Sequence, residues 1–470
     1  MANLLESYKN RLTISESVHQ RSHNGAKMSN AKKLMIASVL NNTSKFMNEA
    51  FDSSAATQRS ALGDYKKFCL NVSTVALPNL ILPELMLTQP MTSISGYVTY
   101  LRYTAGVTKG NVNEETMFGS VYRHGEMNED RIHYTNERVI ETVPEGATSV
   151  NISWTPIVKG AFTELVDGKP VKRDVKITAE DGTVTYADLE DGATKIEAAA
   201  KSRVAYVYDN VVIPQPNAIP TLKAAMDAID LHAHARRIAV YYSQIAAFQA
   251  KTDYGFDLAD QLSAQAQGEL AYEIDTEGVM MLYKGAEEAS ELVFPSYEKS
   301  IKDTATGSFI SRSQYYEQFN EIIARAKKVI YQRTQKFAPN YMVVGANVLT
   351  IMPYVKGWNA APASQVNGPH FAGSVDGIKV YCSPSIDENK FFFGVNGSDL
   401  QTSAAVYAPY MAIVPTQLLG FADGGMSQGF STMYDMKLLS TYDGSWEKGT
   451  NKDNKDGEHS YLLVAGRFDA

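Results

Sequence analysis

Residues 77–106 read LPNLILPELMLTQPMTSISGYVTYLRYTAG, and this stretch decides how the chain is organised. Its three prolines interrupt any helix, because proline lacks an amide hydrogen and clashes with the preceding turn. Residues 97–103 (YVTYLRY) are aromatic and β-branched, which is typical of a strand. We therefore predict an irregular segment that ends in a strand, and this strand leads into a long loop that begins near Gly106.

The residues before this stretch, 1–76, are polar and helical in pattern, with short apolar patches such as Leu34, Met35, Val39 and Leu40. A segment without a core of its own is stable only when it lies against another surface. We expect an amino-terminal arm that packs on something else, such as another copy of the chain.

After the stretch, residues 135–210 alternate short β-like runs with turn dipeptides. Asp-Gly occurs at 167–168, 181–182 and 191–192, and Asp-Gly between alternating runs is a strong hairpin signal. The linker 213–220 (IPQPNAIP) contains three prolines, which stop both helix and interior strand. We predict a small antiparallel β-domain inserted in the long loop.

Two long helices are expected beyond the linker. Residues 257–283 carry an apolar side chain at every fourth position, which predicts a helix about 40 Å long at 1.5 Å per residue. Residues 314–335 carry an i, i+4, i+7, i+8 apolar stripe, and Ser311 with Gln314 fits a capping box ahead of it.

Residues 218–250 give conflicting signals, because their propensity is helical but residues 232–241 alternate with a period of two. Ser243 fits an N-cap for a short helix that ends at Gly255. From Asn340 onwards six strands are expected, at YMVVG, IKVYC, KFFFGV, AAVYAPYMAIV, FSTMYDMKLL and YLLVAG. The fold class is therefore mixed α and β.

Composition excludes several classes of protein. The chain has 470 residues, of which 44% are hydrophobic and 20% charged, so it can bury a large core in about three units. Its net charge of −8 disfavours tight DNA wrapping and binding to an anionic membrane. With only Cys69 and Cys382, a disulfide scaffold and a thiolate zinc cluster are excluded. No apolar run of ~18 residues or signal-peptide core occurs, so we expect a cytoplasmic product.

One motif suggests catalysis. Residues 425–429 (GMSQG) match the G-x-S-x-G nucleophile elbow, in which Ser427 would be the nucleophile. An elbow needs a strand before the serine and a helix after it, whereas here a loop precedes it and a strand follows. His459 is the only later histidine. We therefore interpret the motif as a glycine-rich loop.

No cofactor or metal is expected. His232 and His234 would share one face of a strand, but a third ligand is not apparent. Residues 452–457 superficially resemble a calcium loop, and Lys452 at the first ligand position excludes it. The usual glycine-rich nucleotide cradles are missing from the sequence. We expect the basic pair Arg236-Arg237 to form ion pairs rather than phosphate contacts.

Three separated motifs resemble a known family. The first contains Gln89, Pro90 and Met91 in a Q-P-M motif, the second is the turn at 254–257 before the long helix, and the third joins a Y-A-P-Y strand with Pro409 and Tyr410 to a G-F-x-T segment with Gly429 and Phe430. In this order they resemble the T-even-type branch of tailed-bacteriophage major capsid proteins. That family usually continues with Arg-Tyr, whereas this chain has Met433-Tyr434.

The resemblance implies an α+β Hong Kong 97-like capsid fold with an inserted antiparallel β-domain. The implied parts are an amino-terminal arm (1–76), the first shell strand and start of the extended loop (77–134), the inserted β-domain (135–210), a peripheral domain with its spine helix at 257–283 (211–310), an axial domain (311–403) and a return to the peripheral domain (404–470).

The resemblance also implies a function. The protein would be a non-enzymatic virion component, made in the host bacterial cytoplasm, that self-assembles into hexamers and pentamers of an icosahedral or prolate head around double-stranded DNA. Its implied partners are a scaffold, a portal and decoration or vertex proteins, without a membrane or sequence-specific DNA binding.

The family removes an amino-terminal segment after a glutamate in an I/L-x-E context, and Glu6 and Glu16 fit this pattern. Two other functions stay open from the sequence: an encapsulin-like compartment shell, and a serine hydrolase that uses Ser427.

Overall fold

The computed structural model describes most of the chain, and the described residues are 2–22, 27–52, 70, 74, 77–109, 117–118, 134–135, 137–143, 149–152, 154, 157–158, 161–166, 169–171, 175–178, 183–186, 202–208, 220–255, 257–295, 297, 311–334, 336–361, 368–416, 419–439, 441–442 and 459–469. They separate into two compact units. Unit 1 comprises Met1–Val98, Ala228–Ser445 and Lys452–Ala470, and unit 2 comprises Thr99–Asp227 and Trp446–Asn451.

The described helices fall mainly in unit 1. The α-helices are α1 (Ala2–Ser7), α2 (Lys9–Ser22), α3 (Asn30–Asp52), α5 (Leu82–Leu85), α7 (Gln244–Gln249), α8 (Leu258–Lys284), α10 (Arg312–Glu317), α11 (Phe319–Thr334) and α12 (Ala346–Ile351). Short helical turns of other types are η1 (Leu77–Asn79), η3 (Ala250–Tyr254), η4 (Met352–Tyr354) and η5 (Leu400–Thr402). All of residues 2–52 that are described therefore lie in or beside helices, as the arm was expected to.

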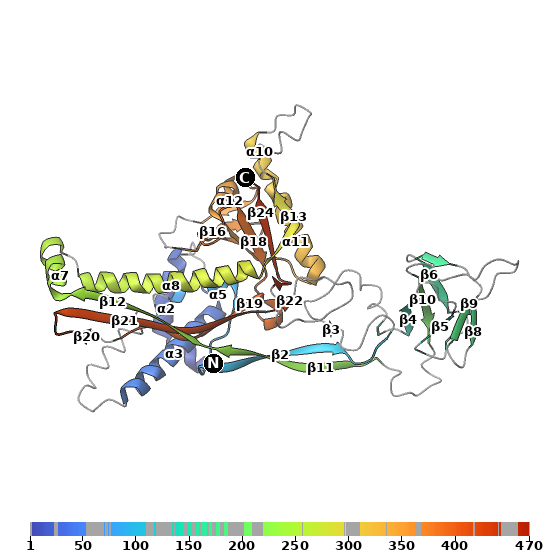
Figure 1. Cartoon of the computed structure of the whole chain (residues 1–470), viewed down its shortest axis with the longest axis horizontal. Helices are drawn as coiled ribbons and strands as arrows, with labels where there is room; N and C mark the ends of the chain where they lie inside the picture. The colour runs from blue at the N-terminus through green and yellow to red at the C-terminus, as the bar shows by residue number, and fades with distance from the viewer. Residues whose placement is uncertain are drawn as a thin grey trace. The chain divides into compact units, whose positions relative to one another are not determined.

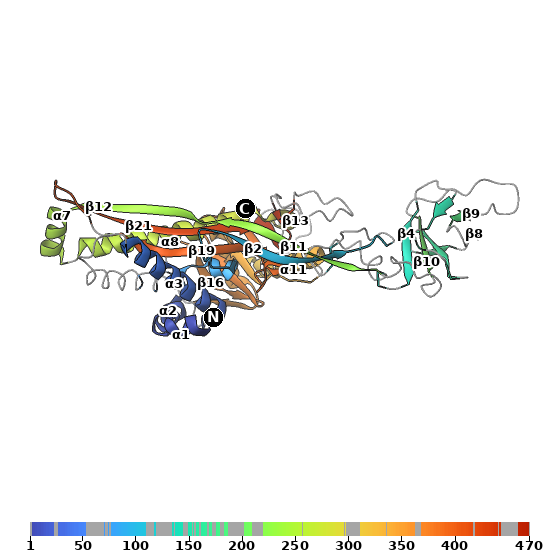
Figure 2. The same ribbon diagram turned by 90° about the horizontal axis from the view of Figure 1, so that it is seen from below.

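The first sheet of unit 1 lies between α8 and α3 (Figure 1). Its strands follow the order β1 (Leu87–Thr88), β19 (Ala405–Pro415), β21 (Gly425–Leu438) and β12 (His234–Ser243), with β20 (Leu419–Gly420) beside β21. Ile413 packs with residues of the α8 side, whereas its neighbour Val414 packs with Met47 of α3. Successive residues of a strand face opposite sides, so the two helices cover opposite faces of the sheet (Figure 2).

Residues 222–243 form strands, although their propensity is helical. They make β11 (Leu222–His232) and β12, and β12 pairs with β21 without interruption from His234–Tyr434 to Ser243–Gly425. Here the period of two determines the structure, because a strand beside β21 can turn Ile238 and Val240 towards α8. Ser243 caps α7 through Ala246, as predicted, and Gly255 ends the following π-turn with φ +73°.

The predicted long helix is present as α8, and 27 residues give it a length of about 40 Å. The side chain of Asp257 accepts a hydrogen bond from the amide of Ala259 and begins the helix. The second predicted helix differs from expectation, since 314–335 forms part of two helices, α10 and α11, with a break at Gln318. The predicted capping box of Ser311 and Gln314 is confirmed.

The second sheet of unit 1 forms the other core. Its seven strands follow the order β13 (Glu287–Phe294), β24 (Leu463–Phe468), β18 (Lys390–Gly394), β14 (Tyr341–Val344), β17 (Ile378–Cys382), β16 (His370–Val375) and β15 (Trp358–Ala360). The three phenylalanines of β18 are completely buried, and α11 packs beside β13 and β24. All six strands expected after Asn340 are confirmed across the two sheets.

Unit 2 contains short antiparallel sheets. One joins β4 (Arg138–Thr142), β10 (Ser202–Val207), β6 (Thr163–Val166) and β7 (Lys169–Val171), and another joins β5 (Ser149–Asn151), β9 (Thr183–Tyr186) and β8 (Val175–Thr178). In a further sheet, β2 (Ser95–Ala105) pairs with β11 and β3 (Met117–Phe118), and β2 and β11 have residues in both units. The strands that flank Asp167-Gly168 and Asp181-Gly182 pair as the hairpin prediction requires, β6 with β7 and β8 with β9, whereas the dipeptides themselves lie outside the described residues. Residues 191–192 lie outside the described residues.

Two glycines of α8 provide a matched test of how α5 packs. A Cβ added at Gly278 would lie 2.3 Å from the Cδ2 atom of Leu82, whose side chain is fully buried, whereas one added at Gly268 would meet nothing within 4 Å. We expect Gly278→Ala to lower the free energy of unfolding by about 1–3 kcal/mol through overpacking. Gly268→Ala should raise it by up to about 1 kcal/mol, because alanine favours a helix.

Urea denaturation of the two variants and the wild type measures both changes. A stabilisation by Gly278→Ala as large as that by Gly268→Ala would contradict the close approach of α5 and α8.

Candidate assembly junction

The Q-P-M motif lies beside the Y-A-P-Y strand. The amide of Gln89 donates to the Tyr407 carbonyl at 2.9 Å, and the amide of Met91 donates to the Pro409 carbonyl at 3.1 Å. These bonds extend the parallel pairing of β1 with β19. Pro90 has no amide hydrogen, and it occupies the position between two donating residues, where the pairing needs no donor from it.

The arm helix α3 joins the same two segments. The side-chain amide of Asn42 donates to the Met91 carbonyl at 2.6 Å and to the Tyr410 carbonyl at 3.2 Å. One turn of α3 therefore contacts both motifs, 49 and 368 residues away in sequence. Because the acceptors are backbone carbonyls, this contact depends on strand position rather than on neighbouring side chains.

The G-F-x-T segment meets the long helix. Phe430 is 1% exposed and packs with Ala266, Leu270 and Ile413. Gly429 donates its amide to the Thr416 hydroxyl at 2.7 Å and accepts from the Thr416 amide at 2.6 Å. The first and third family motifs thus lie in one sheet between α3 and α8, and Asp257 of the second motif begins α8.

Arg236 forms ion pairs, as predicted. Its guanidinium contacts Glu277 and lies 3.8 Å from Glu273, both on α8, and it stands 5.5 Å from the centre of the Tyr434 ring. Burial raises the pKa of Tyr434, whose hydroxyl donates to Glu277 at 2.6 Å. The resembled family usually has an arginine before this tyrosine, where this chain has Met433. Here the arginine that lies over the Tyr434 ring comes from β12. Arg237 faces the other side of β12 and is exposed.

A buried lysine connects the arm to the junction segment, which we define as residues 77–91. The Lys32 side chain is 3% exposed, and its ammonium donates to the carbonyls of Pro78 at 3.0 Å and Leu80 at 3.2 Å. It also lies 3.6 Å from the Glu84 carboxylate. Burial lowers the pKa of Lys32, and the charges of Glu84 and Asp275 oppose that shift.

Glu84 collects contacts from three elements. Its carboxylate accepts from the Tyr381 hydroxyl at 2.6 Å and pairs with Lys379 at 3.0 Å, both on β17, and its Oε1 lies 3.9 Å from His19 of α2. The Glu84 side chain is 11% exposed. Burial raises the pKa of Tyr381, and the Glu84 charge adds to that shift. This carboxylate therefore joins the arm, the junction segment and the second sheet.

Asp275 of α8 holds the start of α5. Its carboxylate accepts from the amides of Ile81 at 3.2 Å and Leu82 at 3.3 Å. Burial raises the pKa of Asp275 to about 7, while the two amide donors and Lys32 act in the opposite direction. Two donors from an otherwise uncapped helical turn explain why a buried carboxylate is retained here.

Ser427 does not lie in a glycine-rich loop, so that interpretation was wrong. Residues 425–429 form the start of β21, and Ser427 pairs with Tyr241 of β12 and Leu419 of β20. Successive residues of a strand face opposite sides, so the small residues Gly425, Ser427 and Gly429 share one face. From the sequence we interpreted these small residues as a loop. A strand continues on both sides of Ser427, and this geometry does not form an elbow.

His232 and His234 lie next to each other, as expected for this part of the chain. The rings of His232 and His234 are 5.2 Å apart, and His232 contacts the Ser95 hydroxyl at 2.9 Å. Within the part of the chain that the structure describes, no three His, Cys, Asp or Glu side chains are grouped to hold a metal ion. Among the same residues, no helix is long and apolar enough to cross a membrane.

The two glutamates that fit a cleavage context lie in different environments. Glu6 is exposed in α1, whereas Glu16 is half-buried in α2 and pairs with Lys33 at 2.9 Å. Cleavage after either residue stays a prediction.

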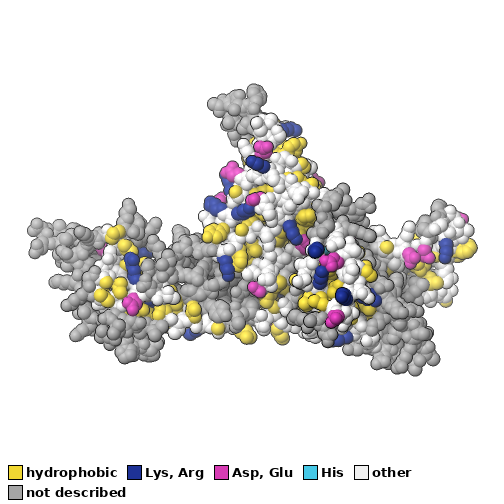
Figure 3. Space-filling model, turned by 180° about the vertical axis from the view of Figure 1, so that it is seen from behind, with side chains coloured by type: hydrophobic (Ala, Val, Ile, Leu, Met, Phe, Trp, Pro, Cys, Tyr) yellow, Lys and Arg dark blue, Asp and Glu magenta, His cyan; other side chains and the backbone are white. Residues whose placement is uncertain are grey.

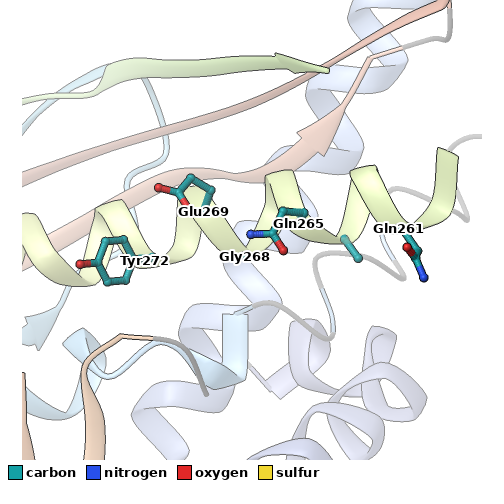
Figure 4. Close-up of a pocket in the computed structure, with 6 residues that line it drawn as sticks. Gln261, Gln265, Gly268, Glu269 and Tyr272 are labelled. Atoms are coloured by element: carbon teal, nitrogen blue, oxygen red, sulfur yellow. The ribbon is translucent and has the colours of Figure 1, made fainter. Parts of the chain in front are cut away.

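A groove runs along α8, lined by Gln261, Ala264, Gln265, Gly268, Glu269 and Tyr272 (Figure 4). Its polar side chains are the amides of Gln261 and Gln265, the carboxylate of Glu269 and the phenol of Tyr272. On the face shown in Figure 3, lysine and arginine side chains are scattered among acidic ones rather than gathered.

Comparison with known proteins identifies the class. The family model described as "Major capsid protein Gp23" matches residues 63–464. The major capsid protein of Enterobacteria phage T4 is 21% identical over 387 residues, which cover 77% of this chain and 73% of that protein.

Solved structures are also similar, at low scores. A chain from Mycobacterium phage Che8 is 15% identical with a TM-score of 0.32 and covers 52% of this chain and 74% of its own. The capsid of Myoviridae phage XM1 is 8% identical with a TM-score of 0.32 and covers 68% and 86%. The assignment therefore rests on the sequence match.

The class is that of structural proteins of tailed-phage heads. Within it, the chain belongs to the Gp23 family of major capsid proteins, and it is a capsid component of the virion rather than an enzyme.

The raised pKa of Asp275 makes stability depend on pH. The folded protein binds this proton more tightly than the unfolded chain, so the free energy of unfolding falls as pH rises from about 4 to about 7, by up to ~1.4 kcal/mol per pH unit. Asp275→Asn keeps an acceptor for the two amides but cannot titrate. We expect a smaller loss of stability between pH 5 and pH 8 than in the wild type.

Urea denaturation at both pH values measures this difference. Glu269→Gln, an exposed site on the same helix, is the matched control and should follow the wild type. An unchanged pH dependence in Asp275→Asn would contradict the assignment.

Proposed function

We propose that copies of this chain assemble into hexamers and pentamers that tile a closed head around double-stranded DNA. The observation that carries the proposal is the match to the Gp23 family over 402 of 470 positions, residues 63–464. A lattice needs only moderate individual contacts, because each subunit makes many of them at once.

The proposed layout is of the Hong Kong 97 type. It combines the arm (1–76), the extended loop with its insertion (77–134 and 135–210), the peripheral domain with the spine helix α8 (211–310), the axial domain (311–403) and the return (404–470). The paired strands β2 and β11, the length of α8 and the two sheets of unit 1 support this layout. A scaffold, a portal and decoration or vertex proteins are its proposed partners.

Of the two other functions, neither is favoured. The strand through Ser427 argues against a serine hydrolase. An encapsulin-like shell would use the same kind of assembly but would load a cargo protein, and the family match favours a phage head.

Electron microscopy of the expressed chain, alone and with its scaffold, tests assembly. We expect closed shells or sheets built from hexamers. Persistent monomers under every co-expression and ionic condition would contradict the proposal.

Residues 135–210 are proposed to be a separable accessory domain. A buried cluster around Trp154, Val204 and Tyr206 gives this region a core of its own. Deleting 135–210 and rejoining the loop should leave a soluble subunit that forms shells of altered thermal stability, measured by scanning calorimetry. Complete loss of soluble expression would show that the region is part of the main core.

The proposed contact with the genome is weak and independent of sequence. The net charge of −8 gives no general attraction for phosphate, and Arg236 is already paired with acidic residues of α8. In a titration with duplex DNA, we expect no tight binding at physiological salt. Tight binding that persists at that salt concentration would overturn the expectation.

A further inference from the structure

The arm is held to the rest of unit 1 in two physically different ways. Helix α3 is embedded by apolar contacts, through the buried side chains Met35, Ile36, Val39, Leu40 and Met47. Among the described side chains of α2, the buried ones are Leu12, Ser15 and His19. Helix α3 is therefore held mainly by apolar contacts, and helix α2 largely by polar ones.

The polar contacts of α2 reach Thr74 and helix α3. The hydroxyl of Ser15 donates to the Thr74 carbonyl at 2.9 Å. Glu16 pairs with Lys33 of α3 at 2.9 Å, and the His19 ring lies 3.4 Å from the Lys32 ammonium. These contacts follow successive turns on one side of α2, at positions 15, 16 and 19.

Polar and apolar contacts differ in what their loss costs. When a buried polar contact opens to water, both partners regain hydration, so its net contribution is small. Opening an apolar contact exposes hydrocarbon without compensation. Local opening therefore detaches α2, which is held largely by polar contacts, in preference to α3, which is held by apolar contacts.

We propose that α1 and α2, residues 2–22, form a clip that opens and closes while α3 stays packed in unit 1. Lys32 of α3 is the residue that the closed clip contacts. In the closed state the clip covers the side of the Lys32 and Glu84 pair that His19 faces. In the open state water reaches both charges. Opening the clip thus changes the environment of the carboxylate that joins α3, the junction segment and β17.

Glu16 reports the state of the clip. It is half-buried in α2, follows the buried Ser15 and pairs with Lys33 of α3. A glutamate-specific endopeptidase needs an extended backbone around its cleavage site. Cleavage after Glu16 therefore requires α2 to detach and unwind around this residue.

The test uses the full chain, with the endopeptidase and mass spectrometry as readout. In Ser15→Ala, which leaves the Thr74 carbonyl without this donor, cleavage after Glu16 should be about tenfold faster than in the wild type. Lys32→Met should act in the same direction. Lys27→Met, an exposed arm position, is the matched control and should leave the rate of cleavage after Glu16 unchanged.

Amide hydrogen exchange keeps the test independent of how well each variant folds. In the wild type, the amides of α2 should exchange faster than those of α3 and α8, and Ser15→Ala should accelerate α2 alone. Equal acceleration in α2, α3 and α8 would show that the arm opens only with the whole unit and would overturn the proposal. An unchanged Glu16 rate in both variants would overturn it as well.

Discussion

The structure of unit 1 depends on charged side chains that are buried against the junction segment. Three prolines keep the regular elements of residues 77–91 short, at η1, α5 and β1, so the segment cannot satisfy all of its backbone groups by itself. Lys32 supplies donors to two of its carbonyls, and Asp275 accepts from two of its amides. A lysine of the arm and an aspartate of the long helix thus bind adjacent parts of the segment, residues 78–80 and 81–82, ahead of Gln89 and Met91, which pair along β19.

This arrangement links the parts that a shell subunit has to keep in register. The junction segment contacts α3 through Asn42, the first sheet through β19 and the second sheet through Glu84. Replacing buried ion pairs by apolar groups often stabilises a protein, so stability alone does not explain why the charges are present. Charged groups with fixed geometry specify one position for a segment, which apolar packing does less strictly.

The sequence predicts most elements because their patterns are local. The stripe of α8, the capping box at Ser311 and the strands after Asn340 depend on residues near one another in the chain. The break at Gln318 was missed, because an apolar stripe continues across it, and GMSQG was misread because glycine and serine also fit a strand packed beside Thr416. The family motifs located the junction, but the charges that hold it were not identified. Asp275 directly follows Ile274 of the apolar stripe of α8, and a carboxylate beside that stripe was the available signal.

The central claim is that the arm and the junction segment are coupled through buried charge, and a double-mutant cycle between Lys32→Met and Glu84→Gln tests it most directly. Urea denaturation of the wild type, both single variants and the double variant gives the coupling energy. The account predicts a coupling above about 1 kcal/mol, because the pair is 3.6 Å apart and almost fully buried. Additivity of the two single effects within about 0.5 kcal/mol would contradict it.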